Sequence, residues 1–238
     1  MLYPWMQAHD RQLLLEHEAA IIERLSQVCH AQTSLLLDKA NLGELITNCH
    51  SQHKLMMSDQ LPSAHLNQVG LCLGDIEHLP FMDSCSDFLI LPHIVEDAQD
   101  PKACLSEVSN LVTPEGYILL LHLLPFSHWR AKYKGQTNKH PIQWIKPFKL
   151  RQWLNKLGFE YIASDKFINP FSHSQHGTST VLEKIISTVI PSICNAHWML
   201  AKKRQSNAPL IRLSWQSRRD IIAASKGLAN VSLRELSK

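Results

Sequence analysis

Hydrophobic and polar residues alternate along this chain with two different periods. Between residues 9 and 28, apolar residues recur at about helical spacing with charged residues between them, which predicts an amphipathic helix. Beyond it, short apolar runs alternate with further helical patterns. The runs that predict strands are 34–37, 54–57, 69–73, 88–91 and 117–124, and the patterns that predict helices are 42–49 and 101–112.

Strands separated by helices indicate βαβ units, so the predicted fold class is α/β with a parallel sheet. Helices cover both faces of such a sheet, and its strands are therefore expected to be apolar throughout, as 118–121 is. The pattern changes after residue 124. We expect a long loop at 125–147, a helix at 148–157 ended by Gly158, a strand at 159–168, a helix at 181–190, a strand at 193–200 and a mobile tail at 205–238.

The composition narrows the class of protein. A chain of 238 residues, 45% hydrophobic and 19% charged, suffices for one large domain with appendages. It has no uncharged apolar run of membrane-spanning length and no basic region before an apolar N-terminal stretch, so we expect neither a membrane span nor a secretory signal. The six cysteines form no C-x-x-C pair, which favours a reducing, cytoplasmic location.

The charges are unevenly distributed along the chain. Residues 1–124 contain 5 Lys and Arg against 16 Asp and Glu, residues 125–198 contain 10 against 3, and residues 199–238 contain 9 against 2. The basic part either contacts an anionic partner or pairs with the acidic part within one fold, and we favour the second interpretation. Its cations alternate with aromatic residues, which can bind RNA or an anionic lipid surface, but we favour a solvated face whose aromatic rings point inward.

The most specific stretch begins with Gly74 and Asp75, directly after the predicted strand 69–73. A carboxylate at the carboxyl end of a strand in an α/β sheet can accept a hydrogen bond from a ligand's amino group, because ligands bind in that crevice. Asp75 is equally suited to cap the turn that follows, and the spacing alone leaves both roles open.

Several motifs in order resemble the type 11 family of class I S-adenosylmethionine-dependent methyltransferases. They are GD-x-E-x-LPF-x-D-x-x-x-D at 74–87, an apolar strand ending near His93, and 107–119 with Pro114 and Gly116. The strand 196–204 resembles the family's last, antiparallel strand, so the resemblance covers about residues 33–204. It implies a Rossmann-like, three-layer α/β/α sandwich with a mostly parallel seven-stranded sheet and an antiparallel last strand.

The resemblance also implies a division of the chain. Residues 1–30 would form a leading helix, 31–204 the methyltransferase-like domain and 205–238 a basic flexible tail. Within the domain, 125–147 and 169–192 would be insertions on the substrate side. There, Phe126, His128 and Trp129 would border the pocket of a small-molecule or lipid-like acceptor.

The cofactor implied by the resemblance is S-adenosylmethionine. Asp75 with Ile76, following Gly74, would hold the adenine, and His93 would lie beside the cofactor. Asp59 is the candidate that would hold the ribose hydroxyls.

The family's glycine-rich first loop corresponds to residues 38–44, which retain a single glycine and are therefore degenerate. Ala40 is small and Asn41 tolerates a positive φ, so a narrow loop can still form. The cofactor residues that the resemblance implies in this loop are Asp38, Ala40, Asn41 and Gly43.

Methyl transfer mainly requires alignment of a nucleophile with the methyl group, so catalytic residues leave little trace in a sequence. If a general base is needed, His93 and His122 are the candidates, although each also fits a structural histidine at the end of a strand. The cysteine and histidine spacings match no zinc pattern, and we expect no metal site. The alternative to a methyltransferase is an inactive methyltransferase-like protein that serves as a binding or partner module, which the altered first loop favours.

Overall fold

The computed structural model describes residues 6–39, 42–62, 66, 68–75, 78–127, 129–130, 142–167 and 195–204, which include one seven-stranded sheet. Its strands are β1 (Thr33–Asp38), β2 (His53–Ser58), β3 (Val69–Leu73), β4 (Ser86–Pro92), β5 (Val112–Leu123), β6 (Phe159–Phe167) and β7 (Ala196–Lys203). Across the sheet they follow the order β3-β2-β1-β4-β5-β7-β6. The first five strands pair in parallel, and β7 runs antiparallel to both β5 and β6. The predicted fold class is confirmed.

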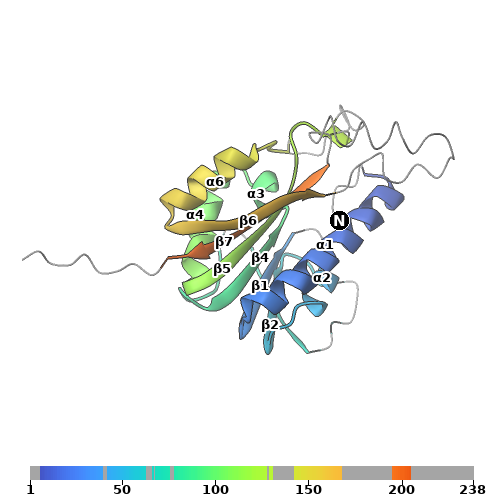
Figure 1. Ribbon diagram of the computed structural model, residues 1–238. Coiled ribbons are helices and arrows are strands. Elements are labelled where there is room, and N and C mark those ends of the chain that lie inside the picture. The colour runs from blue at the N-terminus through green and yellow to red at the C-terminus, as the bar shows by residue number, and fades with distance from the viewer. Residues whose placement is uncertain are drawn as a thin grey trace, which may run out of the picture. The chain divides into compact units, whose positions relative to one another are not determined.

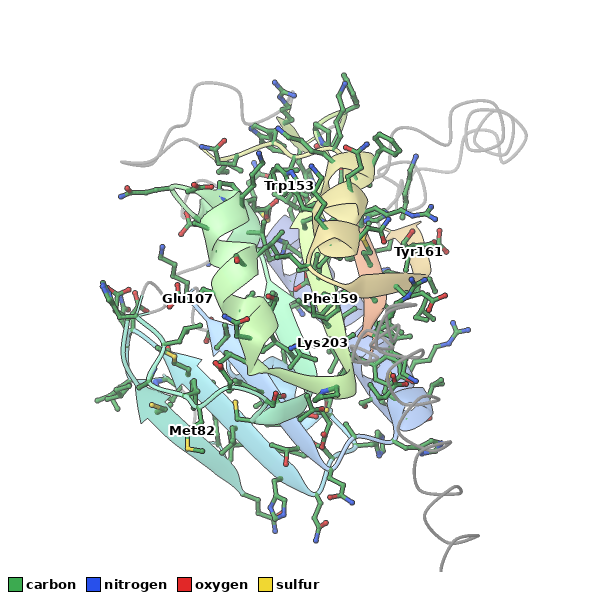
Figure 2. All side chains as sticks on the ribbon, turned by 90° about the vertical axis from the view of Figure 1, so that its left-hand side faces the viewer. Met82, Glu107, Trp153, Phe159, Tyr161 and Lys203 are labelled. Atoms are coloured by element: carbon green, nitrogen blue, oxygen red, sulfur yellow. The ribbon has the colours of Figure 1, made fainter. Side chains whose placement is uncertain are left out.

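Helices cover both faces of this sheet. The described helices are α1 (Ala8–Cys29), α2 (Glu44–Thr47), α3 (Ile94–Asp97), α4 (Pro101–Leu111) and α6 (Pro147–Lys156). The helix α1 lies on one face, and α4 and α6 lie on the other (Figures 1 and 2). Two buried hydrophobic clusters correspond to these two interfaces.

The central strands are apolar at every position because successive side chains enter opposite clusters. In β1, Leu36 packs with Leu14 and Ile22 of α1, whereas Leu35 and Leu37 belong to the cluster of α4 and α6. All three β1 leucines are fully buried. Burial on both faces therefore explains the continuous apolar runs from which these strands were predicted.

The edge strand β3 departs from this expectation. Its residues Leu71 and Leu73 are 42% and 53% exposed. The reason is topological, since no helix occurs among the described residues of the connections on either side of β3.

Most predicted elements agree with the structure, and the differences are local. Helix 9–28 corresponds to α1, and Gly158 ends α6 with a φ of +85°, as its predicted capping role requires. The helix predicted at 42–49 is reduced to the single turn α2, and β5 begins five residues earlier than predicted. The predicted helix 181–190 and the tail 205–238 lie outside the described residues.

The described helices include none that combines the length and the apolar character needed to cross a membrane.

Replacing Leu36 tests the two-sided burial of the sheet. Leu36→Ala should lower the free energy of unfolding by about 2–5 kcal/mol, because it leaves a cavity between β1 and α1. Leu61→Ala, at a side chain that is 71% exposed, should change it by less than about 0.5 kcal/mol. Urea denaturation followed by circular dichroism measures the free energy of unfolding of both variants. Equally small losses of stability in the two variants would contradict the burial of Leu36 between β1 and α1.

Candidate functional site

The strand order locates a candidate site at the carboxyl ends of β1 and β4. The chain winds outward in both directions from this pair of strands, and open α/β sheets bind ligands at such a switch point. Four residues predicted for the site follow neighbouring strands here. Asp38 ends β1, Asp59 follows β2, Asp75 follows β3 and His93 follows β4. The topology therefore brings them to one edge of the sheet.

The loop after β1 is closed by hydrogen bonding and packing. The buried Asp38 accepts a hydrogen bond at Oδ2 from the backbone N–H of Leu42, 2.7 Å away. A Cβ atom on Gly43 would lie 2.7 Å from Met56 Sδ and 2.9 Å from Leu66 Cδ1. Gly43 thus allows α2 to approach β2, which is a packing role. Ala40 and Asn41 lie outside the described residues.

An ion pair crosses the switch point. Lys39 Nζ, just after β1, lies 3.2 Å from Oδ2 of Asp97 in α3, and both side chains are more than a third exposed. A cavity of about 280 Å³ adjoins this pair. Its lining residues are Lys39, Ile94, Ala98, Gln99, Asp100, Ala103, Cys104 and Glu107.

The carboxylates after β2 and β3 are accessible to solvent. Asp59 is exposed, and the Asp75 side chain is 66% exposed, with Oδ2 3.7 Å from His78 Nδ1. The N–H of Gly74 donates to the carbonyl of Ser58 at 3.0 Å, which holds the ends of β3 and β2 side by side. Ile76 lies outside the described residues.

A buried cluster of three ionisable side chains surrounds His93. Its Nδ1 lies 2.6 Å from Glu96 Oε1, and its Nε2 lies 2.8 Å from Glu18 Oε1 in α1. The second Glu96 oxygen accepts the backbone N–H of Leu123 at 2.9 Å. His93 itself has a φ of +58° and donates its N–H to the carbonyl of Leu121 in β5. The cluster therefore joins α1, α3, β4 and β5.

The two carboxylates decide the charge of the His93 ring. Burial alone lowers the pKa of an imidazole, but Glu18 and Glu96 attract and hydrogen-bond the charged form and raise the pKa of His93 to about 10. Because both ring nitrogens face carboxylate oxygens, the ring donates from both as an imidazolium. It has no lone pair left with which to accept a proton.

Two further buried histidines lie near this cluster. His122 of β5 and His197 of β7 are register partners, and their ring centroids are 4.8 Å apart. Among the described residues, neither nitrogen of His122 has a hydrogen-bond partner. Burial, followed by the charges of His197 and His93, lowers the pKa of His122. Burial and Lys166 lower the pKa of His197 to about 4. Both rings are therefore neutral near pH 7.

The residues predicted for the acceptor side differ in exposure. Phe126 is 70% exposed, whereas Trp129 is 2% exposed and belongs to the hydrophobic cluster under α1. The backbone N–H of Trp129 donates to Asn195 Oδ1 at 3.2 Å, which fixes the segment after β5 against the start of β7. His128 lies outside the described residues.

Sequence reasoning missed Glu18 and Glu96 as members of the site. A signal for Glu18 was present, because the buried residues of α1 are Leu14, Glu18, Ile22 and Ser26, spaced four apart. A carboxylate on the apolar side of an amphipathic helix requires a buried partner. Glu96 lies three residues after His93, a spacing that places two side chains on one face of a helical turn.

Comparisons with known proteins agree with this architecture. Residues 29–120 match the protein family described as "Methyltransferase domain". The uncharacterized protein YafS of Escherichia coli strain K12 is 23% identical over 135 residues, which are 55% of this chain and 54% of YafS. The match thus spans about half of that relative.

Solved structures are similar to this chain in fold. A methyltransferase from Archaeoglobus fulgidus gives a TM-score of 0.57 at 18% identity and covers 79% of this chain and 94% of its own. A possible histamine N-methyltransferase from Thermotoga maritima gives a TM-score of 0.56 at 16% identity, with 82% and 95% covered.

The three buried histidines predict how stability depends on pH. His93 has a pKa raised to about 10, so its stabilising contribution is complete below its unfolded pKa of about 6.5 and is lost as the pH rises toward 10. His122 and His197 have lowered pKa values, so their contribution is complete above pH 6.5 and is lost as the pH falls toward 4. Urea denaturation from pH 4.5 to 9 should show maximal stability near pH 6.5.

The variant Glu18→Gln distinguishes the loss of stability at high pH (the alkaline limb) from the loss at low pH (the acid limb). Removing one carboxylate lowers the pKa of His93, so the alkaline loss, which still begins above the unfolded pKa of about 6.5, should end at a lower pH and be smaller, while the acid limb keeps its shape. Glu16→Gln, at an exposed position of the same helix, is the matched control and should leave both limbs unchanged. An alkaline limb identical in the two variants would contradict the imidazolium assignment.

Proposed function

We propose that this chain, in which residues 29–120 match a methyltransferase domain, transfers a methyl group from S-adenosylmethionine to an acceptor molecule. The observation that carries the proposal is the row of carboxylates Asp38, Asp59 and Asp75 at the carboxyl ends of β1, β2 and β3, beside the switch point of the sheet. The strand order and the carboxylate side chains thus both favour the carboxyl edge of the sheet as the cofactor site.

The residues at this edge fit an adenosyl cofactor by their chemistry. Such a cofactor presents an amino group on the adenine, hydroxyl groups on the ribose and an ammonium group on the amino acid, all of which donate hydrogen bonds to carboxylates. We assign the adenine to Asp75 with Ile76, the ribose to Asp59, and the amino-acid part to Asp38 and the loop that follows it. When bound, the cofactor supplies an electrophilic methyl group.

The degenerate first loop sets a condition on this binding. Lys39 stands where the family has a glycine-rich turn, and its pairing with Asp97 bridges the crevice. Exposed ion pairs contribute only about 0–1 kcal/mol, so opening this pair for a cofactor costs little. The same ion pair favours the second candidate function, an inactive methyltransferase-like module in which the crevice stays closed.

The histidines take different roles in the proposed reaction. His93 acts as a positioning residue, because its doubly hydrogen-bonded imidazolium cannot accept a proton. His122 remains the candidate base, because its neutral ring has a lone pair that can accept a proton, but burial lowers its pKa and makes it a weak base. Phe126, His128 and Trp129 are assigned to the acceptor side, where a small-molecule or lipid-like acceptor would approach.

Isothermal titration with S-adenosylmethionine and S-adenosylhomocysteine tests the cofactor site. Asp75→Ala should weaken binding by about 10–100-fold, because a hydrogen bond to a charged group contributes about 1.5–3 kcal/mol. Asp83→Ala removes an exposed carboxylate from the same connection between β3 and β4, outside the proposed cofactor contacts, and should leave the affinity unchanged.

The same experiment distinguishes the two candidate functions. Binding that is lost in Asp75→Ala and kept in Asp83→Ala supports the methyltransferase. If the folded wild-type protein gives neither heat nor a shift in melting temperature, the methyltransferase proposal is wrong and the binding module remains. Lys39→Gly should then restore cofactor binding if the ion pair with Asp97 is what closes the crevice.

A further inference from the structure

A groove lined by lysine and tryptophan residues lies between the beginnings of α4 and α6. Its volume is about 630 Å³, and its lining residues are Asp100, Pro101, Lys102, Gln143, Trp144, Ile145, Lys146, Lys149 and Trp153. Figure 2 shows Trp153 at the upper ends of these helices. We call this groove, together with the flanking Phe126 and Phe148, the basic–aromatic surface.

Within the described part of the chain, the three lysines of the basic–aromatic surface, Lys102, Lys146 and Lys149, form no ion pair with an acidic side chain. Asp100 also lines the groove, but its Oδ1 accepts the N–H groups of Lys102 and Ala103 and caps α4. The lysines come from two segments that are far apart in the sequence, the beginning of α4 and the beginning of α6, so their convergence is a property of the fold and produces a local positive potential.

The ammonium groups lie over aromatic rings. Lys102 Nζ and Lys149 Nζ are 5.7 and 5.0 Å from the centre of the Trp153 ring system. Lys146 Nζ is 5.8 Å from the centre of the Phe126 ring. Cations in these positions are held by the π electrons while remaining open to an anion from solvent.

Two exposed phenylalanines neighbour these lysines, since Phe126 lies beneath Lys146 and Phe148 precedes Lys149 in the sequence. Phe126, in the turn after β5, and Phe148, in the first turn of α6, are each 70% exposed. Neither lines the groove, and Lys146 lies between them in the sequence. Exposed aromatic side chains beside unpaired lysines are an arrangement typical of proteins that bind membrane surfaces.

We propose that the basic–aromatic surface docks onto an anionic lipid bilayer. The lysines contact the phosphates of the headgroups, and Phe126 and Phe148 enter the boundary between headgroups and acyl chains. A bilayer satisfies both features at once. Single-stranded RNA fits less well, because the ring of Trp153 on which a base could stack is already covered by two ammonium groups.

Docking in this orientation brings the candidate site to the lipid surface. Asp100 lines both the groove and the 280 Å³ cavity beside Lys39, so the two are neighbours. Phe126 also belongs to the acceptor side of the proposed reaction. The acceptor is therefore a lipid or another amphipathic molecule held at the membrane. This assignment of the acceptor rests on the proposed function, whereas the docking itself does not.

Vesicle flotation of the full-length protein without cofactor tests the docking. Vesicles of phosphatidylcholine alone are compared with vesicles containing one quarter phosphatidylglycerol. The wild type should bind the anionic vesicles and lose binding as salt increases. Replacing Lys102, Lys146 and Lys149 together by Gln should reduce the partition coefficient about 100-fold, from about fivefold per lysine near an anionic surface. Phe126→Ser with Phe148→Ser should reduce it about tenfold or more.

Matched controls make the same kind of change in charge or polarity at residues outside the basic–aromatic surface. Replacing Arg24, Lys54 and Lys156 by Gln removes three cations from other positions, and Met82→Ser alters a side chain that is 82% exposed on the β3 side. If docking is specific to this surface, the partition coefficient of both controls should stay within about threefold of the wild-type value. Circular dichroism confirms that every variant is folded.

Three outcomes would overturn the docking. The first is a wild type that binds neither kind of vesicle, and the second is a loss of binding that is equal in the surface variants and the controls. The third is a lysine variant that loses affinity for a single-stranded RNA probe but keeps its affinity for vesicles. Titration of the same lysine variant with S-adenosylmethionine should give the wild-type affinity, so failure of the docking is distinguishable from failure of the cofactor site.

Discussion

Burying the His93 imidazolium requires Glu18 and Glu96 to reach the same point from different parts of the chain. A charge in the interior is costly unless it is paired and hydrogen-bonded, and here both nitrogens of the ring are satisfied. Leucines along α1 could pack against the sheet in several nearby positions, whereas among the described residues the Glu18 carboxylate pairs with His93 alone. The ion pair between Glu18 and His93 therefore fixes where α1 lies along the sheet.

The same cluster reaches the acceptor side through the backbone. Glu96 accepts the N–H of Leu123 at the end of β5, and its own carbonyl accepts the N–H of Gln143 at 2.7 Å. Gln143 lines the groove of the basic–aromatic surface. One buried charge thus sets the relative positions of the helix before the sheet, the crevice at its switch point and the segment that leads into α6. After burial and the charge of His197, it also contributes to lowering the pKa of the neighbouring His122.

The sequence predicted what depends on local pattern and missed what depends on distant partners. The strands around β1 and β4 could be found because burial on both faces makes them apolar at each position, and the residues after them then fall at one edge by topology. The buried contact between Glu18 and His93 spans 75 positions of the chain, and no periodicity reports such a pair. The predicted helix 42–49 has apolar residues at helical spacing, but Leu42 is held by Asp38 and Cys49 by Ser34, so only one turn forms between them.

The unevenly distributed charges of the sequence are only partly paired in the fold. We favoured pairing between the acidic and basic parts of the chain, and Lys202 with Glu115 at 2.7 Å is such a pair. Arg204 pairs instead with Glu160 of the basic part, and Lys39 with Asp97 of the acidic part. The cations of the basic–aromatic surface remain unpaired within the described residues.

An acidic edge suited to a cationic sulfonium cofactor therefore adjoins a basic surface suited to an anionic partner, and Asp100 marks the boundary between them. Opposite potentials on neighbouring surfaces attract ligands of opposite charge to adjacent places, and a transfer between two bound molecules requires that they lie close together.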